Sequence, residues 1–218
     1  MLVYHFHNGE LRDGRPLPDI GEWLEHYGPT IPCKYGLHGS EHPFDALKYA
    51  PGPYLDRDDL DGNLVPHGDP IDTIDKWCGQ RRMRLATIDA TDLLREFARW
   101  CALQVIHLWD APGVMRRFLE TGDETLREAA YAAAEDGSKE AACDSHWYAA
   151  KSALWAVSGG AAQEVALGVS SASLAAVSCH AAKSLYVCEA LDAARAAQRD
   201  KFKQMVGEAF EKAGCNVD

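Results

Sequence analysis

The spacing of hydrophobic and polar residues divides the chain into two parts that predict different secondary structure. Before residue 90 the pattern is short and alternating: Tyr4 and Phe6 fall on one face of an expected strand at residues 2–7, and His5 and His7 fall on the other. After residue 91, apolar residues recur every three or four positions, which indicates helices. The chain therefore predicts an α+β fold, with a small mixed N-terminal α/β unit at residues 1–90 and an Ala-rich C-terminal helical array at residues 91–218.

The N-terminal part predicts short elements separated by turns. Two further strands are expected at residues 33–37 and 83–88. A short helix begins at Pro43, where the fixed φ of proline suits the first helical position, and it ends before Pro51. Loops rich in Asp, Gly and Pro are expected between these elements.

The acidic segment Asp56–Gly62 has two readings, a calcium-binding loop or a solvated loop. Aligning Gly62 with the invariant glycine of an EF-hand puts Arg57 at the first ligand position and Gly68 where the bidentate Glu belongs. These residues cannot coordinate the ion there, so we favour the solvated loop.

The C-terminal part predicts successive helices, in which 24 of the 75 residues from 126 to 200 are alanine. The expected helices span residues 91–108, 114–121, 124–136, 139–158, 161–182 and 184–213, with Gly122, Gly137 and the Gly159-Gly160 pair as breaks. Alanine-faced helices with few large side chains leave apolar surface for a second copy of the chain. Self-association as a homo-oligomer is therefore a further expectation.

Charge and cysteine usage narrow the class of protein. The chain has 22 basic and 33 acidic residues, a formal net charge of −11, and this surface repels phosphate backbones, so broad nucleic-acid binding is not expected. Seven cysteines without a C-x-x-C pair are typical of reduced thiols. No secretory signal and no apolar stretch of about 20 residues occurs, so we expect a cytoplasmic protein without membrane contact.

Histidines supply the first candidate site. His5 and His7 share one face of the first expected strand, and His38 lies in a Gly-Leu-His-Gly-Ser turn that ends at Ser40, with Cys33 just upstream. Three readings stay open: a transition-metal site, a polar ligand or catalytic pocket, and ordinary surface or hydrogen-bonded histidines. The spacings match no established set of metal ligands, so no metal is expected.

Arginines supply the second candidate. Arg81, Arg82 and Arg84 form the one dense basic cluster of an acidic chain, and Arg82 and Arg84 share a strand face from which they could hold a phosphate or carboxylate. The alternative is a solvated edge strand whose charges discourage pairing with other strands. No P-loop, dinucleotide-binding fingerprint or H-E-x-x-H motif accompanies them.

The segments 34–40 (KYGLHGS) and 45–52 (DALKYAPG) resemble an uncharacterised family that is common in phage, prophage and metagenomic sequences. The likeness extends to the aromatic first strand, the acidic segment, the basic strand with a following LREFA helix, and the Ala-rich tail with interspersed Trp. The family has no established activity. The resemblance therefore implies a phage-type origin and no particular chemistry.

The order of a polar first strand, a G-x-H-x-S type turn and a short helix is similar to ADP-ribosyltransferase cores. That resemblance implies NAD as a cofactor, with His5 or His7 and Ser40 as its contacts, and it leaves Glu41 and Glu96 as candidates for the catalytic glutamate of that family.

These observations predict an accessory or host-interaction protein of phage type, with a role against host defence. It would bind a protein partner or a small anionic, nucleotide-like ligand without a cofactor, through His5, His7, His38, Ser40, Arg82 and Arg84. The alternative is an NAD-using enzyme of the ADP-ribosyltransferase type.

Overall fold

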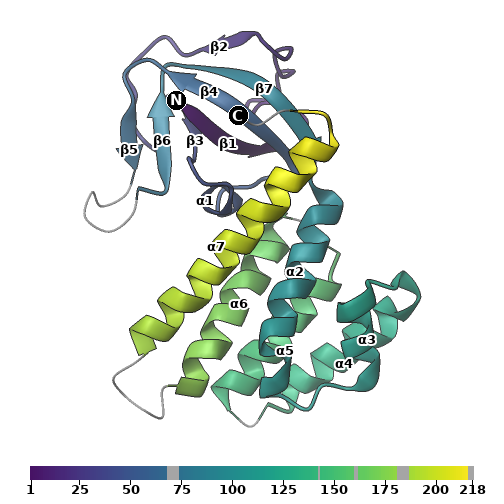
Figure 1. Cartoon of the computed structure of the whole chain (residues 1–218). Coiled ribbons are helices and arrows are strands. Elements are labelled where there is room, and N and C mark those ends of the chain that lie inside the picture. Colours follow the sequence, from purple (N-terminus) through teal and green to yellow (C-terminus); the bar gives the residue numbers. More distant parts are fainter. Residues whose placement is uncertain (68–73, 142, 160–161, 181–186, 216–218) are drawn as a thin grey trace. The chain divides into compact units, whose positions relative to one another are not determined.

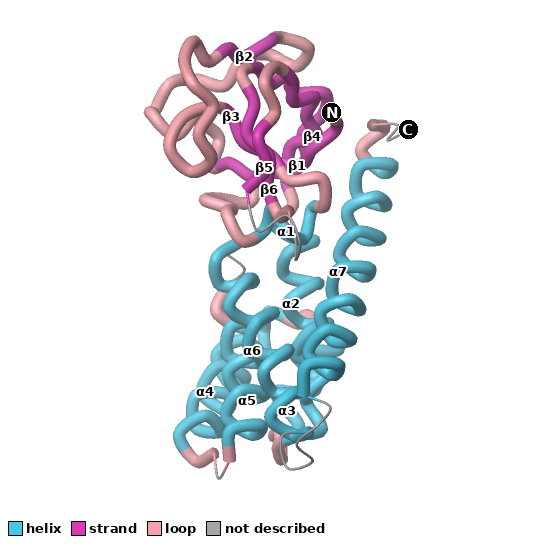
Figure 2. Tube along the Cα trace, turned by 90° about the vertical axis from the view of Figure 1, so that its left-hand side faces the viewer, coloured by secondary structure: helices cyan, strands magenta, loops and turns pink. Residues whose placement is uncertain are grey.

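The computed structural model describes residues 1–67, 74–141, 143–159, 162–180 and 187–215 (Figure 1). The fold is α+β, with antiparallel strands in the N-terminal part and helices in the C-terminal part, as the sequence predicts (Figure 2). The chain separates into two compact units. The first contains Met1–Ala90 together with the residues from Phe202 onward, and the second contains Thr91–Lys201.

Residues from Phe202 onward lie in the strand-bearing unit, although the sequence pattern groups them with the helical array. Aromatic contacts explain their position. The ring of Phe210 lies 6.4 Å from that of Tyr4, and the ring of Phe202 lies 6.3 Å from that of Phe44. Because Phe202 and Phe210 are fully buried, the end of the last helix supplies core to the first unit.

The main sheet has the strand order β1-β4-β7-β2, and all its pairs are antiparallel. The strands are β1 (Leu2–His7), β4 (Tyr54–Asp61), β7 (Arg81–Asp89) and β2 (Trp23–Glu25). One cross-strand row joins Phe6, Leu55 and Ile88, all buried. The next row joins His5, Asp56 and Thr87 on the opposite face, so the strand period of two separates an apolar face from a polar one.

A smaller sheet with the order β3-β6-β5 lies beside this polar face. Its strands are β3 (Leu37–Gly39), β6 (Lys76–Gly79) and β5 (Val65–His67). Ser40 pairs with Tyr4 in an isolated antiparallel bridge. A Cβ added to Gly39 would lie 2.3 Å from Val3 Cγ2, and Val3 shares the strand face of His5. Only glycine allows so close an approach here.

Helix α1 (Pro43–Leu47) begins where the sequence predicts, with Pro43 in its first turn and His42 as the N-cap. Three other N-terminal expectations are wrong. Residues 33–37 do not form a strand; the strand is Leu37–Gly39, and Cys33 has a φ of 65° in the preceding turn. The acidic segment is neither a solvated loop nor a calcium loop, because most of it is strand β4. Strand β7 is not an edge strand, since it pairs with β4 and β2.

The second unit consists of helices. Their bounds are α2 (Thr91–Val105), η1 (Ile106–Leu108), α3 (Gly113–Thr121), η2 (Glu124–Leu126), α4 (Arg127–Lys139), α5 (Asp144–Val157), α6 (Ala162–His180) and α7 (Val187–Lys212), which runs into the first unit. The predicted apolar face of the first helix is buried through Leu94, Phe97 and Cys101. No helix in the described ranges is long and apolar enough to cross a bilayer.

Two of the glycines expected to break helices behave differently; of the Gly159-Gly160 pair, Gly159 follows the end of α5 and Gly160 lies outside the described residues. Gly122 ends α3 with a left-handed φ of 67°, as a C-terminal glycine does. Gly137 lies inside α4 and breaks nothing. Its missing side chain makes room for Trp109, because an added Cβ would lie 2.2 Å from the indole Cζ3. Gly137 is therefore a packing residue.

Candidate functional site

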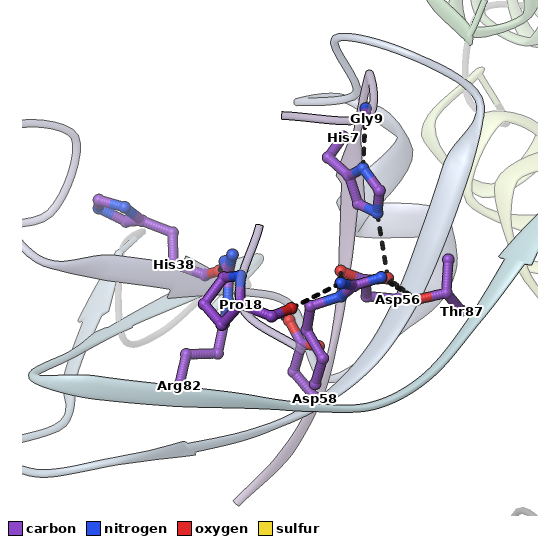
Figure 3. Close-up of polar contacts among 9 residues, drawn as sticks. His7, Gly9, Pro18, His38, Asp56, Asp58, Arg82 and Thr87 are labelled. Carbon is purple, nitrogen blue, oxygen red and sulfur yellow. Dashed lines mark hydrogen bonds and ion pairs between the residues drawn. The ribbon is translucent and has the colours of Figure 1, made fainter. Parts of the chain in front are cut away.

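A buried network on the polar face of the main sheet centres on Asp56, whose side chain is inaccessible to solvent. His7 Nε2 donates to Asp56 Oδ1 at 3.1 Å, while His7 Nδ1 accepts the Gly9 N–H at 3.0 Å. Arg84 Nε donates to Asp56 Oδ2 at 3.1 Å, and the Thr87 hydroxyl donates to Oδ1. Figure 3 shows His7 and Thr87 meeting at Asp56. We call His7, Asp56, Arg84 and Thr87 the closed network.

The closed network satisfies its own charges. Arg84 uses its remaining donors on the Pro18 carbonyl at 2.9 Å and on Thr87. Burial by itself would raise the pKa of Asp56, but the hydrogen bonds from His7 and Thr87 and the charge of Arg84 outweigh it and hold that pKa below its ordinary value. Both ring nitrogens of His7 are occupied, and each of the three guanidinium nitrogens of Arg84 donates to a group of the chain itself. We assign it a structural role.

A second buried pair lies beside it. Arg82 Nε is 3.0 Å from Asp58 Oδ2, and both side chains are almost wholly buried (Figure 3). Arg82 Nη1 donates to the His38 carbonyl at 2.5 Å, which links the main sheet to β3. The fork of Arg82 is therefore directed at groups of the chain itself.

Asp58 is poorly satisfied by this pairing. In the described part of the chain, neither of its carboxylate oxygens accepts a hydrogen bond of acceptable geometry. Burial raises the pKa of Asp58 to about 7, against the opposing charge of Arg82. Its carboxyl group therefore changes charge near neutral pH inside the first unit.

His38 lies on the far side of Arg82, among several cations. Burial, followed by the charges of Lys76, Arg82, His67 and Arg12, lowers the pKa of His38 to about 4. The imidazole is therefore neutral at pH 7. Its Nε2 accepts the backbone N–H of Cys33 at 3.1 Å, so the ring proton resides on Nδ1 and is available to a hydrogen-bond acceptor.

Lys76 is the most unusual member of this group. The residue is only 7% exposed, yet among the residues that the structure describes no carboxylate lies within ion-pair distance of its ammonium. Nζ donates to Cys33 Sγ at 3.2 Å and lies 3.7 Å from the centroid of the Tyr49 ring. We call His38, Lys76, Cys33 and Tyr49, with Arg12, the open cluster.

Tyr49 connects the open cluster to Asp75, which also contacts two basic residues. The phenol donates to Asp75 Oδ2 at 2.8 Å. His67 and Lys48 also contact the carboxylate of Asp75, at 3.1 Å and 3.4 Å. Burial and the hydrogen bond to Asp75 raise the pKa of Tyr49. The phenol therefore stays neutral and presents its ring face to the ammonium of Lys76, which favours a cation–π contact.

The structure distributes the sequence-predicted residues among these groups. His7 and Arg84 belong to the closed network, Arg82 is paired with Asp58, and His38 belongs to the open cluster. The side chain of His5 makes no hydrogen bond or ion pair with any described residue. Burial, with the nearby Arg82, His7 and His38, holds the pKa of His5 well below its ordinary value.

Ser40 is buried, and its backbone exchanges hydrogen bonds with Tyr4 at 2.7 Å and 3.0 Å. Both predicted arginines are engaged by carboxylates that the sequence interpretation placed in a solvated loop. Sequence reasoning missed Asp56, Asp58, Lys76 and Tyr49 as parts of a site. For the two acids a signal existed: residues 56 and 58 share a strand face, as do 82 and 84. For Lys76 and Tyr49 no signal existed, because lysine is usually a surface residue and tyrosine occurs both inside proteins and on their surface.

No group of three or more His, Cys, Asp or Glu side chains in the described segments is arranged to hold a metal ion. Comparisons of the chain with protein-family models, with curated proteins and with solved structures give no match. The candidate site is therefore assigned from the contacts of these residues alone.

Proposed function

We propose that the first unit binds a small anionic ligand, bearing a phosphate or a carboxylate, at the open cluster. One observation carries the proposal: Lys76 is a nearly buried ammonium whose neighbours are a sulfur and an aromatic ring rather than a carboxylate. A buried charge is costly without a counter-charge. An anion that reaches Nζ supplies that counter-charge.

Two further groups support an anion at this position. The Nδ1–H of neutral His38 is a hydrogen-bond donor that no described residue uses. Arg12 is exposed and makes no ion pair with the described residues, although its charge is felt at His38. A neutral donor that is influenced by the charges of two cations without ion pairs suits a phosphate or carboxylate group.

The same features favour a small ligand over the protein partner that the sequence leaves open. The ammonium of Lys76 is nearly hidden, so a slender anionic group reaches it more easily than a flat protein surface. A long polyanion such as DNA meets an overall charge of −11, which repels it. Arg82 and Arg84 are engaged by Asp58 and Asp56, so they are not assigned direct contacts to the ligand.

We place this binding activity in a cytoplasmic accessory or host-interaction protein of phage type that acts against host defence. The support is the likeness of segments 34–40 and 45–52 to that family, whose first segment contains His38. The ligand-binding residues that the structure favours, Lys76 and Arg12, extend the set that the sequence suggested.

A second candidate is the NAD-using transferase. The bridge between Tyr4 and Ser40 favours it, because it sets Ser40 next to the strand of His5, as the resemblance implies. Its catalytic acid is missing from this arrangement. Glu41 is exposed and accepts the indole N–H of Trp77 at 2.5 Å, and Glu96 belongs to the other unit.

Calorimetric titration at low ionic strength tests the binding proposal, with inorganic phosphate, pyrophosphate, citrate, ADP and NAD as probes. We expect at least one anion to bind, and Lys76→Gln and Arg12→Gln to weaken it by about tenfold each, about 1.4 kcal/mol. Lys34→Gln and Arg15→Gln are matched controls. Lys34 is exposed, and Arg15 is paired with Asp13 in the same loop as Arg12, so both variants retain wild-type affinity.

If Lys76→Gln fails to fold, the Arg12→Gln variant still tests the anion site, because Arg12 is exposed and its replacement should not disturb folding. The proposal is wrong if none of the five anions binds, or if the control variants weaken binding as much as Arg12→Gln does. Release of nicotinamide from NAD, abolished in His38→Ala and in Ser40→Ala, would establish the transferase instead. Absence of nicotinamide release removes that candidate.

A further inference from the structure

We propose that Cys33 is a site of reversible covalent modification, at which its thiol exchanges with small disulfides under activation by Lys76. This chemistry uses the same Lys76 ammonium as the proposed ligand, but it needs no bound anion.

Cys33 differs from the other described cysteines in combining exposure with a cationic neighbour. Its residue is exposed and its Sγ accepts a hydrogen bond from Lys76 Nζ at 3.2 Å. Cys78 and Cys101 are buried, and Cys78 uses its thiol as a donor to the Tyr35 carbonyl at 3.0 Å. A thiol next to an ammonium at a partly exposed position is the environment of reactive cysteines.

The surroundings of Lys76 provide independent support. The ammonium is buried against the Tyr49 ring, and within the described ranges its one hydrogen-bond acceptor is Cys33 Sγ. When the thiol of Cys33 ionises, Lys76 gains the counter-charge that the chain otherwise denies it. The buried ammonium of Lys76 and the sulfur anion of Cys33 then compensate each other's charge, which stabilises the anion.

The backbone holds the thiol in this position. Cys33 has a φ of 65°, a left-handed conformation that is uncommon for a residue with a side chain, and its N–H donates to His38 Nε2 at 3.1 Å. The sulfur is therefore directed at Lys76 by a turn that is anchored on β3.

The exchange is a balanced substitution at sulfur. The Cys33 thiol first releases its proton to solvent, and the sulfur anion is held by the Lys76 ammonium. It then attacks one sulfur of a disulfide R–S–S–R, a new S–S bond to Cys33 forms, and the R–S⁻ that leaves takes a proton from water. The reverse reaction with a small thiol restores Cys33.

Bis(2-hydroxyethyl) disulfide is a suitable probe because it is uncharged, so its reaction does not depend on the proposed anion site. The rate at each cysteine is followed at pH 7 by intact mass and peptide mapping. We expect Cys33 to react in the wild type and Lys76→Gln to slow it by about tenfold. Lys34→Gln, which removes an equal charge from the neighbouring residue, leaves the rate unchanged. Cys143, exposed in the second unit, keeps its rate in every variant and serves as an internal reference.

A second measurement covers the case in which Lys76→Gln does not fold. In the wild type, native Cys33 should react faster than Cys33 in the urea-unfolded chain, even though unfolding increases access. The proposal is overturned if native Cys33 is the slower of the two, or if a folded Lys76→Gln protein reacts at the wild-type rate. If no anion binds in the titration but Cys33 reacts rapidly and depends on Lys76, the proposed anion binding is wrong and the proposed disulfide exchange is supported.

Discussion

The interiors of the two units contain different types of residue. Every charged residue that is buried in the described part of the chain belongs to the first unit, including Asp56, Asp58, Lys76 and Arg82. The second unit buries no charge among its described residues; its buried polar side chains are Ser138, Ser152, Ser173 and Gln198, and alanine supplies much of its core.

This difference indicates where each unit is vulnerable. Removing one member of a buried ion pair leaves the other charge uncompensated, so the first unit is sensitive to the loss of one ion and to pH. An interior of alanine and glycine contains few ion pairs or hydrogen bonds that a substitution could break, but its helices are closely packed. The second unit is therefore sensitive to added side-chain volume. Groups that can bind or react also require polar chemistry, which places the candidate site in the first unit.

The closed network provides the largest expected effect. Arg84→Met keeps much of the side-chain volume but leaves Asp56 buried without its cation, and the Pro18 carbonyl loses its donor. We expect a loss of about 3–5 kcal/mol in the free energy of unfolding, the usual cost of removing one partner of a buried pair. Urea denaturation followed by circular dichroism measures it.

Arg81→Met is the matched control on the same strand. Arg81 pairs with Asp61 at an exposed position and lies over the Trp23 ring, so its loss should cost no more than about 1 kcal/mol. If the two arginine variants are equally stable, the buried network does not hold the first unit together.

Asp58 predicts a stability that depends on pH. Its pKa of about 7 in the folded chain lies above the ordinary 3.8, so the folded state takes up a proton as the pH falls through 7. This uptake stabilises the fold, and stability from this group therefore decreases as the pH rises from about 4 to about 7. Asp58→Asn removes this dependence. Relative to the wild type, the variant should gain at most about 4 kcal/mol across that range.

His38 acts in the opposite direction and must be separated from Asp58. Its pKa of about 4 lies below the ordinary 6.5, so the unfolded chain takes up this proton first and stability is lost as the pH falls from 6.5 to 4. Unfolding curves for Asp58→Asn, His38→Gln and the double variant, at several pH values, distinguish the two groups. A wild-type minus Asp58→Asn difference that stays constant with pH would contradict the raised pKa of Asp58.

Much of the fold could be predicted from the sequence because some elements have complete local signals. Alternation in residues 2–7 and 83–88 sufficed for β1 and β7, and Pro43 marked the start of α1. The strands β2, β5 and β6 have only three or four residues each, too few for a period of two to be detected. Their existence depends on pairing with distant segments.

The site could be predicted only in part, for a related reason. His38 is common to the sequence-based candidates and the open cluster because it lies in a recognisable turn. Strand β4 was misread because acidic residues rarely occupy buried strands. Asp56 and Asp58 are tolerated there since Arg84 and Arg82, about 25 residues later, supply their counter-charges. The composition of one segment does not reveal that residues distant in the sequence neutralise its buried charges in the folded chain.

The smallest expected effect concerns the second unit and tests its lack of room. Gly137→Ala places a methyl group 2.2 Å from Cζ3 and 2.8 Å from Cε3 of the buried Trp109. Overpacking of this kind costs about 1–3 kcal/mol, partly offset by the higher helix propensity of alanine. Gly207→Ala is the control, because Gly207 also lies inside a helix but has no atom within 4 Å of the added Cβ, and it should gain about 0.5–1 kcal/mol. If thermal unfolding shows Gly137→Ala to be as stabilised as Gly207→Ala, the indole has room to shift and α4 does not need the glycine.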